Sequence, residues 1–507
     1  MSGILAAQPR SDPGKPAQPE RDKTVTRRRK EMTAVNANWT YQLKRAFGNR
    51  YAITAVLFLL ITLWGSATVA FGLLEQSGGC KGYARPKDAL LAKADPAVPG
   101  RSLGCDPTDL AAPAPVTPWP RQIAEKTAAA EAAVTKAMKD DHTLIEVFGA
   151  YQNFAGRTVV EDAAQSAYSV VKLADGSLSF VGQGEPDAQV QAGELKRLQT
   201  ALDERDIGFL YLQAPSKLKE EEEDELPYGV WDSSNACADR LLAALEEQDV
   251  DSLDLRGILA RAGGERADWF YKTDHHWTQE AAFLSFQALA RELERYTQTV
   301  RVGLGTKRQS IAIEARYTDP DSYDKTTLSR FFLGSQGKRV GTLYTGVDDF
   351  VLWTPKFPTL LHYAGATGGE RYGDVEETVL FPQRVEERDL YNANPYTYYA
   401  GGDYPFARVT NYYNPQGPKV MLIRDSFACA MTPYLALSCS QLTTIDPRSF
   451  TGDLLSYIDW LEPDVVVVLY STGLVREEEP YRLLAQGAGP SKADALRWKT
   501  DQPTAQK

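Results

Sequence analysis

Histidine is scarce in this chain, whose 507 residues include only His142, His275, His276 and His362. The sequence has no Cys-x-x-Cys motif, so neither a zinc ribbon nor a thioredoxin-like redox site is supported. The segment 334–339 (GSQGKR) lacks the first glycine and the Ser/Thr of a phosphate-binding loop, and we expect an ordinary turn there. Histidine chemistry in this protein must therefore use one of very few residues.

Cysteine is also sparse. The five are Cys80, Cys105, Cys237, Cys429 and Cys439. Closeness in the sequence makes Cys80 with Cys105, and Cys429 with Cys439, the plausible disulfide pairs. The odd number leaves at least one thiol unpaired.

A net positive charge is found only in the first 50 residues. The net charge is −11, and residues 1–50 carry 11 Lys/Arg against 4 Asp/Glu, a net of +7 that leaves −18 for the remainder. An acidic body repels phosphate backbones, so we expect no nucleic-acid partner.

Charge is absent altogether from Ala52 to Leu74, a run of 23 residues rich in Leu, Val, Ile and Phe. A helix of this length covers a hydrocarbon core of about 30 Å, whereas a cleavable signal peptide has an apolar core of about 7–15 residues. We therefore expect an uncleaved signal anchor over 51–74, with a buried core helix as the alternative. The basic cluster around Arg27–Lys30 predicts a cytoplasmic N terminus, and hence a single-pass cell-membrane protein whose globular part lies outside.

Beyond the anchor, prolines crowd residues 81–120, and helix-like and strand-like segments alternate from about residue 143. Strand-like runs at 207–213, 253–255, 420–423, 441–445 and 465–470 alternate with helix-like runs at 192–203, 236–247, 279–294, 427–437 and 454–461. The run VVVVLY at 465–470 is typical of a parallel strand buried on both faces. This pattern predicts an α/β domain.

Short alternating segments such as 339–344 and 350–354 indicate β-hairpins and loops between the two α/β parts. The expected organisation is a disordered basic tail over 1–50, the anchor over 51–74, a Pro/Ala-rich stalk over 75–142, a first α/β part over 143–297, a β-rich insertion over 298–410, a second α/β part over 411–480 and a C-terminal tail over 481–507.

Two short motifs carry the candidate chemistry. Asp274-His275-His276-Trp277 precedes Thr278, a natural N-cap for the helix expected at 279–294. An Asp beside a His can hold the imidazole in one tautomer and stabilise its protonated form. The alternatives are a polar cluster that caps the helix and a metallophosphoesterase site, for which the sequence offers little further support.

The second motif is Asp425-Ser426-Phe427, which follows the strand-like run 420–423 and precedes a helix. A strand, a tight turn and a helix expose a hydroxyl at the carboxyl end of a parallel sheet, with backbone N–H groups available to an oxyanion. Ser426 is therefore a candidate nucleophile, with an ordinary helix cap as the alternative.

Together these motifs resemble the DHHW family of SGNH-hydrolase-like proteins, which is related to the alginate O-acetyltransferase group. The resemblance spans about residues 143–475 and includes YQNFAGRTVVED (151–162), YLQAPSKL (211–218), LDLR (253–256) and FLGSQGKRVGTLY (332–344). It implies a permuted, flavodoxin-type parallel sheet with a β-rich insertion. It also implies Ser426 as nucleophile, His276 as general base and Asp274 as the carboxylate that orients it, with His275 as the fallback base and with neither cofactor nor metal.

One departure concerns the oxyanion hole. SGNH enzymes normally supply an Asn from a later block, yet no Asn follows Ser426 in this sequence. Ser471, Thr472, Arg424 or backbone N–H groups are the remaining donors, and loss of one donor can lower the rate by about 10²–10³.

The resemblance implies a cell-surface O-acetyltransferase that acetylates an extracellular or cell-wall polysaccharide. A membrane-bound O-acyltransferase would be the partner that supplies the acetyl group across the membrane. A carbohydrate acetylesterase with the same triad and a non-catalytic polysaccharide-binding protein are the alternatives.

Overall fold

The computed structural model describes residues 142–162, 168–218, 226–302, 305–365, 369–484 and 487–490, all within the compact unit Pro115–Lys507. The expected basic tail, the membrane anchor and Cys80 and Cys105 lie outside the described residues, as do nearly all of the stalk and most of the C-terminal tail. Among the helices that are described, none has both the length and the apolar character needed to cross a bilayer.

An eight-stranded sheet forms the centre of the described domain, in the order β11-β10-β12-β14-β13-β15-β4-β5. Five neighbouring strands are parallel: β14 (Gln441–Ile445), β13 (Lys419–Arg424), β15 (Val465–Tyr470), β4 (Gly208–Gln213) and β5 (Ser252–Asp254). Antiparallel pairing adds β12 (Phe406–Asn411), β10 (Leu361–Gly365) and β11 (Gly369–Gly373). The expected α/β domain is present, and its sheet is mixed because antiparallel strands from the expected insertion extend the five parallel strands.

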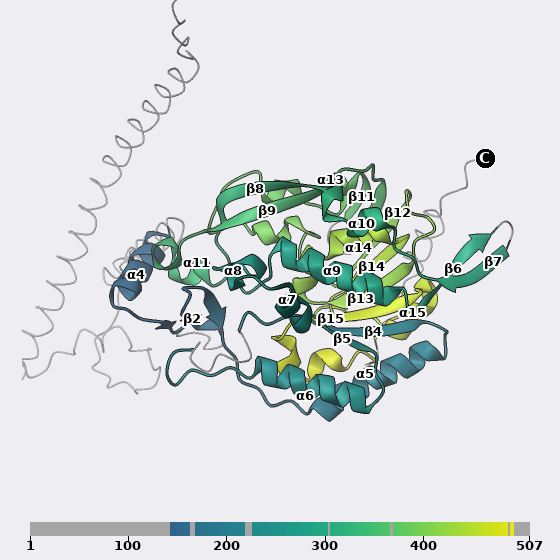
Figure 1. Ribbon diagram of the computed structural model, residues 1–507, viewed down its shortest axis with the longest axis horizontal. Helices are drawn as coiled ribbons and strands as arrows, with labels where there is room; N and C mark the ends of the chain where they lie inside the picture. Colours follow the sequence, from purple (N-terminus) through teal and green to yellow (C-terminus); the bar gives the residue numbers. More distant parts are fainter. Residues whose placement is uncertain are drawn as a thin grey trace, which may run out of the picture. The chain divides into compact units, whose positions relative to one another are not determined.

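Helices cover both faces of this sheet (Figure 1). Along β15, Val466 and Val468 pack with α5 (Ala188–Asp203), α6 (Ser234–Glu247) and α15 (Leu454–Leu461). The alternate residues Val465 and Val467 belong to the opposite core, with α9 (Gln279–Leu293) and α14 (Thr432–Ser438). A strand enclosed by two apolar layers needs hydrophobic side chains at every position, which explains the run of four valines.

The rest of the insertion forms two hairpins, β6 (Thr297–Val302) with β7 (Gly305–Ser310), and β8 (Tyr323–Phe332) with β9 (Asp348–Pro355). The strand expected at 339–344 is wrong: this stretch belongs to the short helices α11 (Gly337–Val340) and α12 (Thr342–Thr345). Gly341, with φ of 81°, separates the two helices in a conformation that favours glycine.

The remaining elements are short or peripheral. They are α4 (Thr143–Phe154), β1 (Val159–Val160), β2 (Val170–Lys172), β3 (Leu178–Phe180), α7 (Arg256–Ala262), α8 (Arg266–Trp269), α10 (Ala315–Thr318), α13 (Val375–Thr378) and the 3-10 turns η2 (Pro320–Ser322), η3 (Pro382–Arg384), η4 (Pro395–Tyr398), η5 (Ser426–Ala430), η6 (Leu474–Arg476) and η7 (Glu479–Tyr481).

The expected disulfide between Cys429 and Cys439 is absent, because both residues are buried free thiols, as is Cys237. Cys429 lies in η5 and Cys439 directly follows α14. The seven residues of that helix alone rise roughly 10 Å, more than the Cα separation of about 7 Å that a disulfide tolerates.

Candidate active site

The candidate site lies at the carboxyl edge of the parallel strands. Strand β13 ends at Arg424, and Ser426 begins the 3-10 turn η5 two residues later. The helix expected over 427–437 is therefore divided into η5 and α14. Asp274 and His276 reach the same place from the loop before α9, whose first turn is capped by the Thr278 side chain as expected.

A continuous hydrogen-bonded relay joins the three residues. The Nδ1 atom of His276 lies 2.5 Å from Asp274 Oδ1, and its Nε2 atom lies 2.8 Å from Ser426 Oγ. Because an ionised carboxylate only accepts hydrogen bonds, Nδ1 carries the ring proton. Neutral His276 is therefore left with Nε2 as an acceptor for the Ser426 hydroxyl proton.

The charge of Asp274 is favoured where it lies. Burial alone raises the pKa of this carboxyl, but the neighbouring imidazoles of His275 and His276 and hydrogen bonds from His276 and the Ser335 N–H hold the pKa well below its ordinary value. The Asp274 side chain thus stays anionic while being almost wholly buried.

A loop from the insertion grips this carboxylate. The Ser335 N–H donates to Asp274 Oδ2 over 2.6 Å, and the Gly334 N–H donates to Thr273 Oγ1 over 2.8 Å. A Cβ atom at Gly334 would lie 2.2 Å from Asp274 Cβ, so only glycine allows this approach. The turn expected over GSQGKR is present only at Ser335 and Gln336, because α11 begins at Gly337, and this turn also positions the candidate triad.

Lys217 supports the same loop from below. Its buried ammonium lies within hydrogen-bonding distance of four backbone carbonyl oxygens, those of Leu178 (2.6 Å), Tyr271 (2.5 Å), Lys272 (3.2 Å) and Asp274 (2.9 Å). Burial lowers the pKa of Lys217 to about 7, against the pull of Asp348 and Asp274. This one side chain ties β3 to the segment that carries the candidate base.

Aromatic side chains hold the turn after Ser426. The indole N–H of Trp277 and the hydroxyl of Tyr396 both donate to the Phe427 carbonyl oxygen, over 2.8 and 3.0 Å. The ring of Tyr396 also stacks on His276, with centroids 4.0 Å apart. The base and the nucleophile are therefore braced by the same tyrosine.

The expected oxyanion donors differ in their availability. Arg424 is almost fully buried and donates to Asp403, the Gly402 and Asp425 carbonyl oxygens and Cys429.

Ser471 donates its N–H to Asp425 Oδ2 over 2.8 Å, and Thr472 is buried beside it. None of Arg424, Ser471 and Thr472 forms a hydrogen bond with Ser426. The Ser426 N–H itself has no hydrogen-bond partner in the described part of the chain, which leaves this backbone group able to receive an oxyanion.

His275 lies outside the relay. Its Nδ1 atom is 3.0 Å from Ser335 Oγ, and burial together with repulsion from His276 lowers its pKa. Asp274, His275 and His276 form a possible metal-ligand group among the described residues, with donor atoms within 4.8 Å of one another. Because Asp274 and His276 are hydrogen-bonded to each other, a metal there would have to break the relay.

Sequence reasoning left Ser335, Lys217 and Tyr396 without a role at this site. The first two fall in blocks that carry the family resemblance, FLGSQGKRVGTLY and YLQAPSKL. The resemblance of these two blocks to the family was the signal that the sequence offered. It could not show that both segments contact the loop that carries Asp274.

Residues 177–322 match the family model described as SGNH hydrolase-like domain, acetyltransferase AlgX. No curated protein matches the chain. The matched segment contains Asp274 and His276 but ends before Ser426.

Several solved structures resemble the chain at low sequence identity. PatB1 of Bacillus cereus is 22% identical, covering 60% of this chain and 97% of its own, with a TM-score of 0.47. A DHHW family protein from Eubacterium siraeum DSM 15702 is 16% identical over 66% of this chain and 98% of its own, with a TM-score of 0.48. AlgX of Pseudomonas aeruginosa is 14% identical over 64% and 68%, with a TM-score of 0.35.

The family match confirms two expectations from the sequence, the resemblance to SGNH-hydrolase-like proteins and the assignment to an acetyltransferase or esterase type of enzyme. Residues 177–322 are thus similar to the SGNH hydrolase-like domain of the AlgX acetyltransferase family.

Proposed function

We propose that this protein is an O-acetyltransferase that uses Ser426, His276 and Asp274 to acetylate a polysaccharide outside the cell. The observation that carries the proposal is the unbroken relay from Asp274 through His276 to Ser426. The acetyltransferase description of the matched family supports the same reaction class.

In the first half-reaction His276 Nε2 accepts the Ser426 hydroxyl proton while Oγ attacks the carbonyl carbon of the acetyl donor. The new bond joins Oγ to the acetyl carbon, and the bond to the donor's leaving group breaks. His276 returns its proton to that leaving group, and the Ser426 N–H is the available donor to the oxyanion. Asp274 stabilises the imidazolium that forms in between.

In the second half-reaction a sugar hydroxyl replaces the leaving group. His276 accepts the hydroxyl proton, the sugar oxygen attacks the acetyl-serine, and the proton passes back to Ser426 Oγ as the ester bond breaks. The products are an acetylated sugar and the original enzyme. Hydrolysis, with water as acceptor, is the second candidate because Ser426 is partly exposed.

The proposed source of the acetyl group rests on the membrane topology expected from the sequence. With the apolar run 52–74 as an anchor and the globular part outside, cytoplasmic acetyl donors are out of reach. A membrane-bound O-acyltransferase that passes acetyl groups across the bilayer is the proposed partner. The anchor would keep the two proteins in one membrane.

The test uses the full-length protein in lauryldimethylamine oxide, with 4-nitrophenyl acetate as donor and cellohexaose as acceptor. We expect Ser426→Ala and His276→Gln each to lower the rate by at least about 10³. His275→Gln is the matched control and should retain most of the activity, because His275 lies outside the relay. Mass spectrometry of the sugar separates transfer from hydrolysis.

Equal rates in the wild type and Ser426→Ala would contradict the proposal. Loss of activity in His275→Gln with retention in His276→Gln would move the general base to the other histidine.

A further inference from the structure

A cavity of about 1580 Å³ opens at the amino ends of the parallel strands. The candidate triad lies at the opposite, carboxyl ends of the same strands. Strand β13 links the two places, since Lys419 at its start lines the cavity and Ser426 follows its end. The rise of a β-strand places these residues roughly 20 Å apart. The cavity is therefore separate from the reacting groups.

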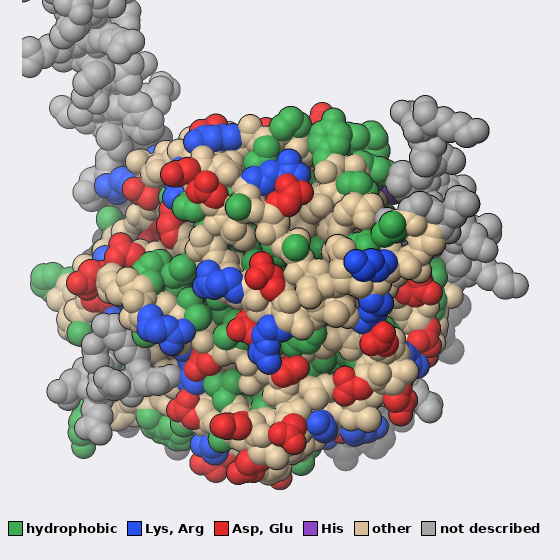
Figure 2. All heavy atoms as spheres, turned by 45° about the vertical axis from the view of Figure 1, so that its right-hand side comes forward, with side chains coloured by type: hydrophobic (Ala, Val, Ile, Leu, Met, Phe, Trp, Pro, Cys, Tyr) green, Lys and Arg blue, Asp and Glu red, His purple; other side chains and the backbone are tan. Residues whose placement is uncertain are grey.

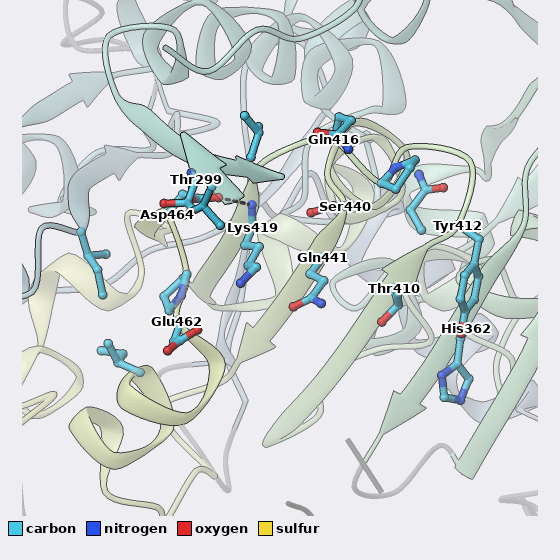
Figure 3. A pocket seen from close by; sticks show the side chains of 18 of the residues that line it. Thr299, His362, Thr410, Tyr412, Gln416, Lys419, Ser440, Gln441, Glu462 and Asp464 are labelled. Atoms are coloured by element: carbon cyan, nitrogen blue, oxygen red, sulfur yellow. Dashed lines mark hydrogen bonds between the residues drawn. The ribbon is translucent and has the colours of Figure 1, made fainter. Parts of the chain in front are cut away.

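Five side chains cross the floor of this cavity as one row. Tyr372, His362, Thr410, Gln441 and Lys419 are successive cross-strand partners on β11, β10, β12, β14 and β13. We call this row the polar ladder. Cross-strand partners face the same side of a sheet, and four strand gaps span roughly 19 Å. Figure 3 shows Lys419, Gln441, Thr410 and His362 following one another across the strands.

The middle of the polar ladder has unused hydrogen-bonding groups. Thr410 is 6% exposed, and its hydroxyl has no partner among the described residues. The Gln441 carboxamide and the Lys419 ammonium likewise form no hydrogen bond with any residue that the structure describes. A buried hydroxyl without a partner is uncommon, so a ligand hydroxyl is the natural complement.

One end of the polar ladder is aromatic. The Tyr372 ring is 61% exposed and lies 5.7 Å from the ring of Tyr412, which also lines the cavity. An exposed ring of this kind offers an apolar face and a polar tip, which suit the C–H face and the hydroxyl rim of a sugar ring.

The charged groups around the cavity largely neutralise one another. Arg205 pairs with Asp459 at 2.7 Å, and Arg308 pairs with Asp206 at 3.2 Å. Figure 2 likewise shows basic and acidic side chains interspersed over the face that it displays. No field of a single sign favours a polyanion, so the chemistry fits an uncharged ligand rich in hydroxyl groups.

We propose that the polar ladder binds an uncharged stretch of polysaccharide, with roughly one sugar ring over each gap between neighbouring strands. This proposal rests on the proposed acetyltransferase function and extends it. A polymer that is held at the amino ends of the strands keeps its other segments near Ser426. Tethering raises the effective concentration of acceptor hydroxyls without a new catalytic group.

The test measures sugar binding directly. Full-length protein in lauryldimethylamine oxide, a detergent without a sugar headgroup, is titrated calorimetrically with cellohexaose, chitohexaose and polygalacturonate. We expect binding of at least one neutral hexasaccharide, and a Kd at least tenfold higher for Tyr372→Ala and for the double variant Thr410→Val, Gln441→Ala. Tyr228→Ala, an equally simple change at an exposed tyrosine outside the cavity, should bind as the wild type does. Thermal unfolding verifies that each variant is folded.

Binding of neither neutral sugar, binding of polygalacturonate alone, or an unchanged Kd in both folded variants would overturn the proposal. Ser426→Ala distinguishes the two proposals, since it should bind the sugars normally. If the wild type binds through the polar ladder but never turns over an acetyl ester, the acetyltransferase proposal fails and the binding site stands.

Discussion

At the scale of single residues, Asp274 is the buried negative charge around which the candidate site is arranged. Its carboxylate accepts hydrogen bonds from the backbone N–H and Nδ1 of His276 and from the Ser335 N–H. Burial raises the pKa of Asp274, but the neighbouring imidazoles of His275 and His276, together with these hydrogen bonds, favour the ionised form and lower the pKa overall. Asp274 therefore stabilises the folded protein and also orients the proposed base, His276.

Asp274→Asn should destabilise the folded protein in a pH-dependent way. A carboxyl whose pKa is depressed on folding contributes stability above its unfolded value of about 3.9, and that contribution disappears as the pH falls through the folded value. We expect a loss of about 1.5–3 kcal/mol at pH 7, which shrinks below about pH 4. Urea unfolding of both proteins at pH 7, 5, 4 and 3 measures the difference.

The control for this series is Asp459→Asn, which removes a largely exposed partner of Arg205 and should change stability by at most about 1 kcal/mol. An Asp274→Asn penalty that grew towards acid pH would contradict the depressed pKa.

The residues of the relay could be named from the sequence because each belongs to a local pattern. An Asp-x-His pair before a capped helix marks Asp274 and His276, and a strand followed by a tight turn marks Ser426. The supports of the relay could not be found in this way. Ser335 lies 61 positions from Asp274, and their contact exists only because the insertion folds back over the loop before α9.

At the scale of elements, the turn between β8 and α11 works as a clamp on the candidate triad. Its Gly334 and Ser335 amides bind Thr273 and Asp274, and the Gly337 N–H donates to the Thr273 carbonyl oxygen. The clamp depends on backbone proximity, which a side chain at Gly334 would prevent.

Gly334→Ala should therefore displace Asp274. The added Cβ would lie 2.2 Å from Asp274 Cβ, and overpacking of this kind costs about 1–3 kcal/mol. A shift of about 1 Å at the relay can lower kcat by about 10²-fold. Ester turnover and urea unfolding report the two effects.

Gly193→Ala is the matched control, because Gly193 lies inside α5 and an added Cβ there meets only a Gln248 side-chain atom at 3.9 Å. It should raise stability by about 0.5–1 kcal/mol and leave turnover unchanged. A fully active, equally stable Gly334→Ala protein would show that the close approach does not matter.

Hydrophobic patterning predicted the α/β elements well where both ends of a strand are marked by turns. The ranges 441–445 and 465–470 coincide with β14 and β15. Hydrophobic patterning could not predict which strands pair with one another. The insertion was expected to be β-rich, but the sequence did not indicate that β10, β11 and β12 extend the central sheet, because pairing at a sheet edge is set by tertiary contacts.

At the scale of the whole molecule, the described domain is held together without a disulfide. Two apolar layers enclose the sheet, and the three cysteines in the described residues are free and buried. A reducing agent should therefore leave the thermal unfolding midpoint of the domain unchanged.

Differential scanning calorimetry with and without a phosphine reductant tests this expectation on the full-length protein with Cys80 and Cys105 both replaced by serine, which removes the other expected disulfide. Loss of a native disulfide typically costs about 2–5 kcal/mol, so a fall of several degrees on reduction would contradict the free state of Cys237, Cys429 and Cys439.

The order of the strands also governs how the protein can be made. Strand β15 lies between β13 and β4 in the sheet, yet β4 is synthesised more than two hundred residues before β13 and β15. Until β15 emerges, β4 and β13 each present an unpaired apolar edge. The turn that carries Ser426 then lacks the neighbouring strand that supports it. If the domain is exported as proposed, the chain stays inactive and prone to aggregation until β15 has emerged, which makes late folding a natural checkpoint for chaperones and proteases.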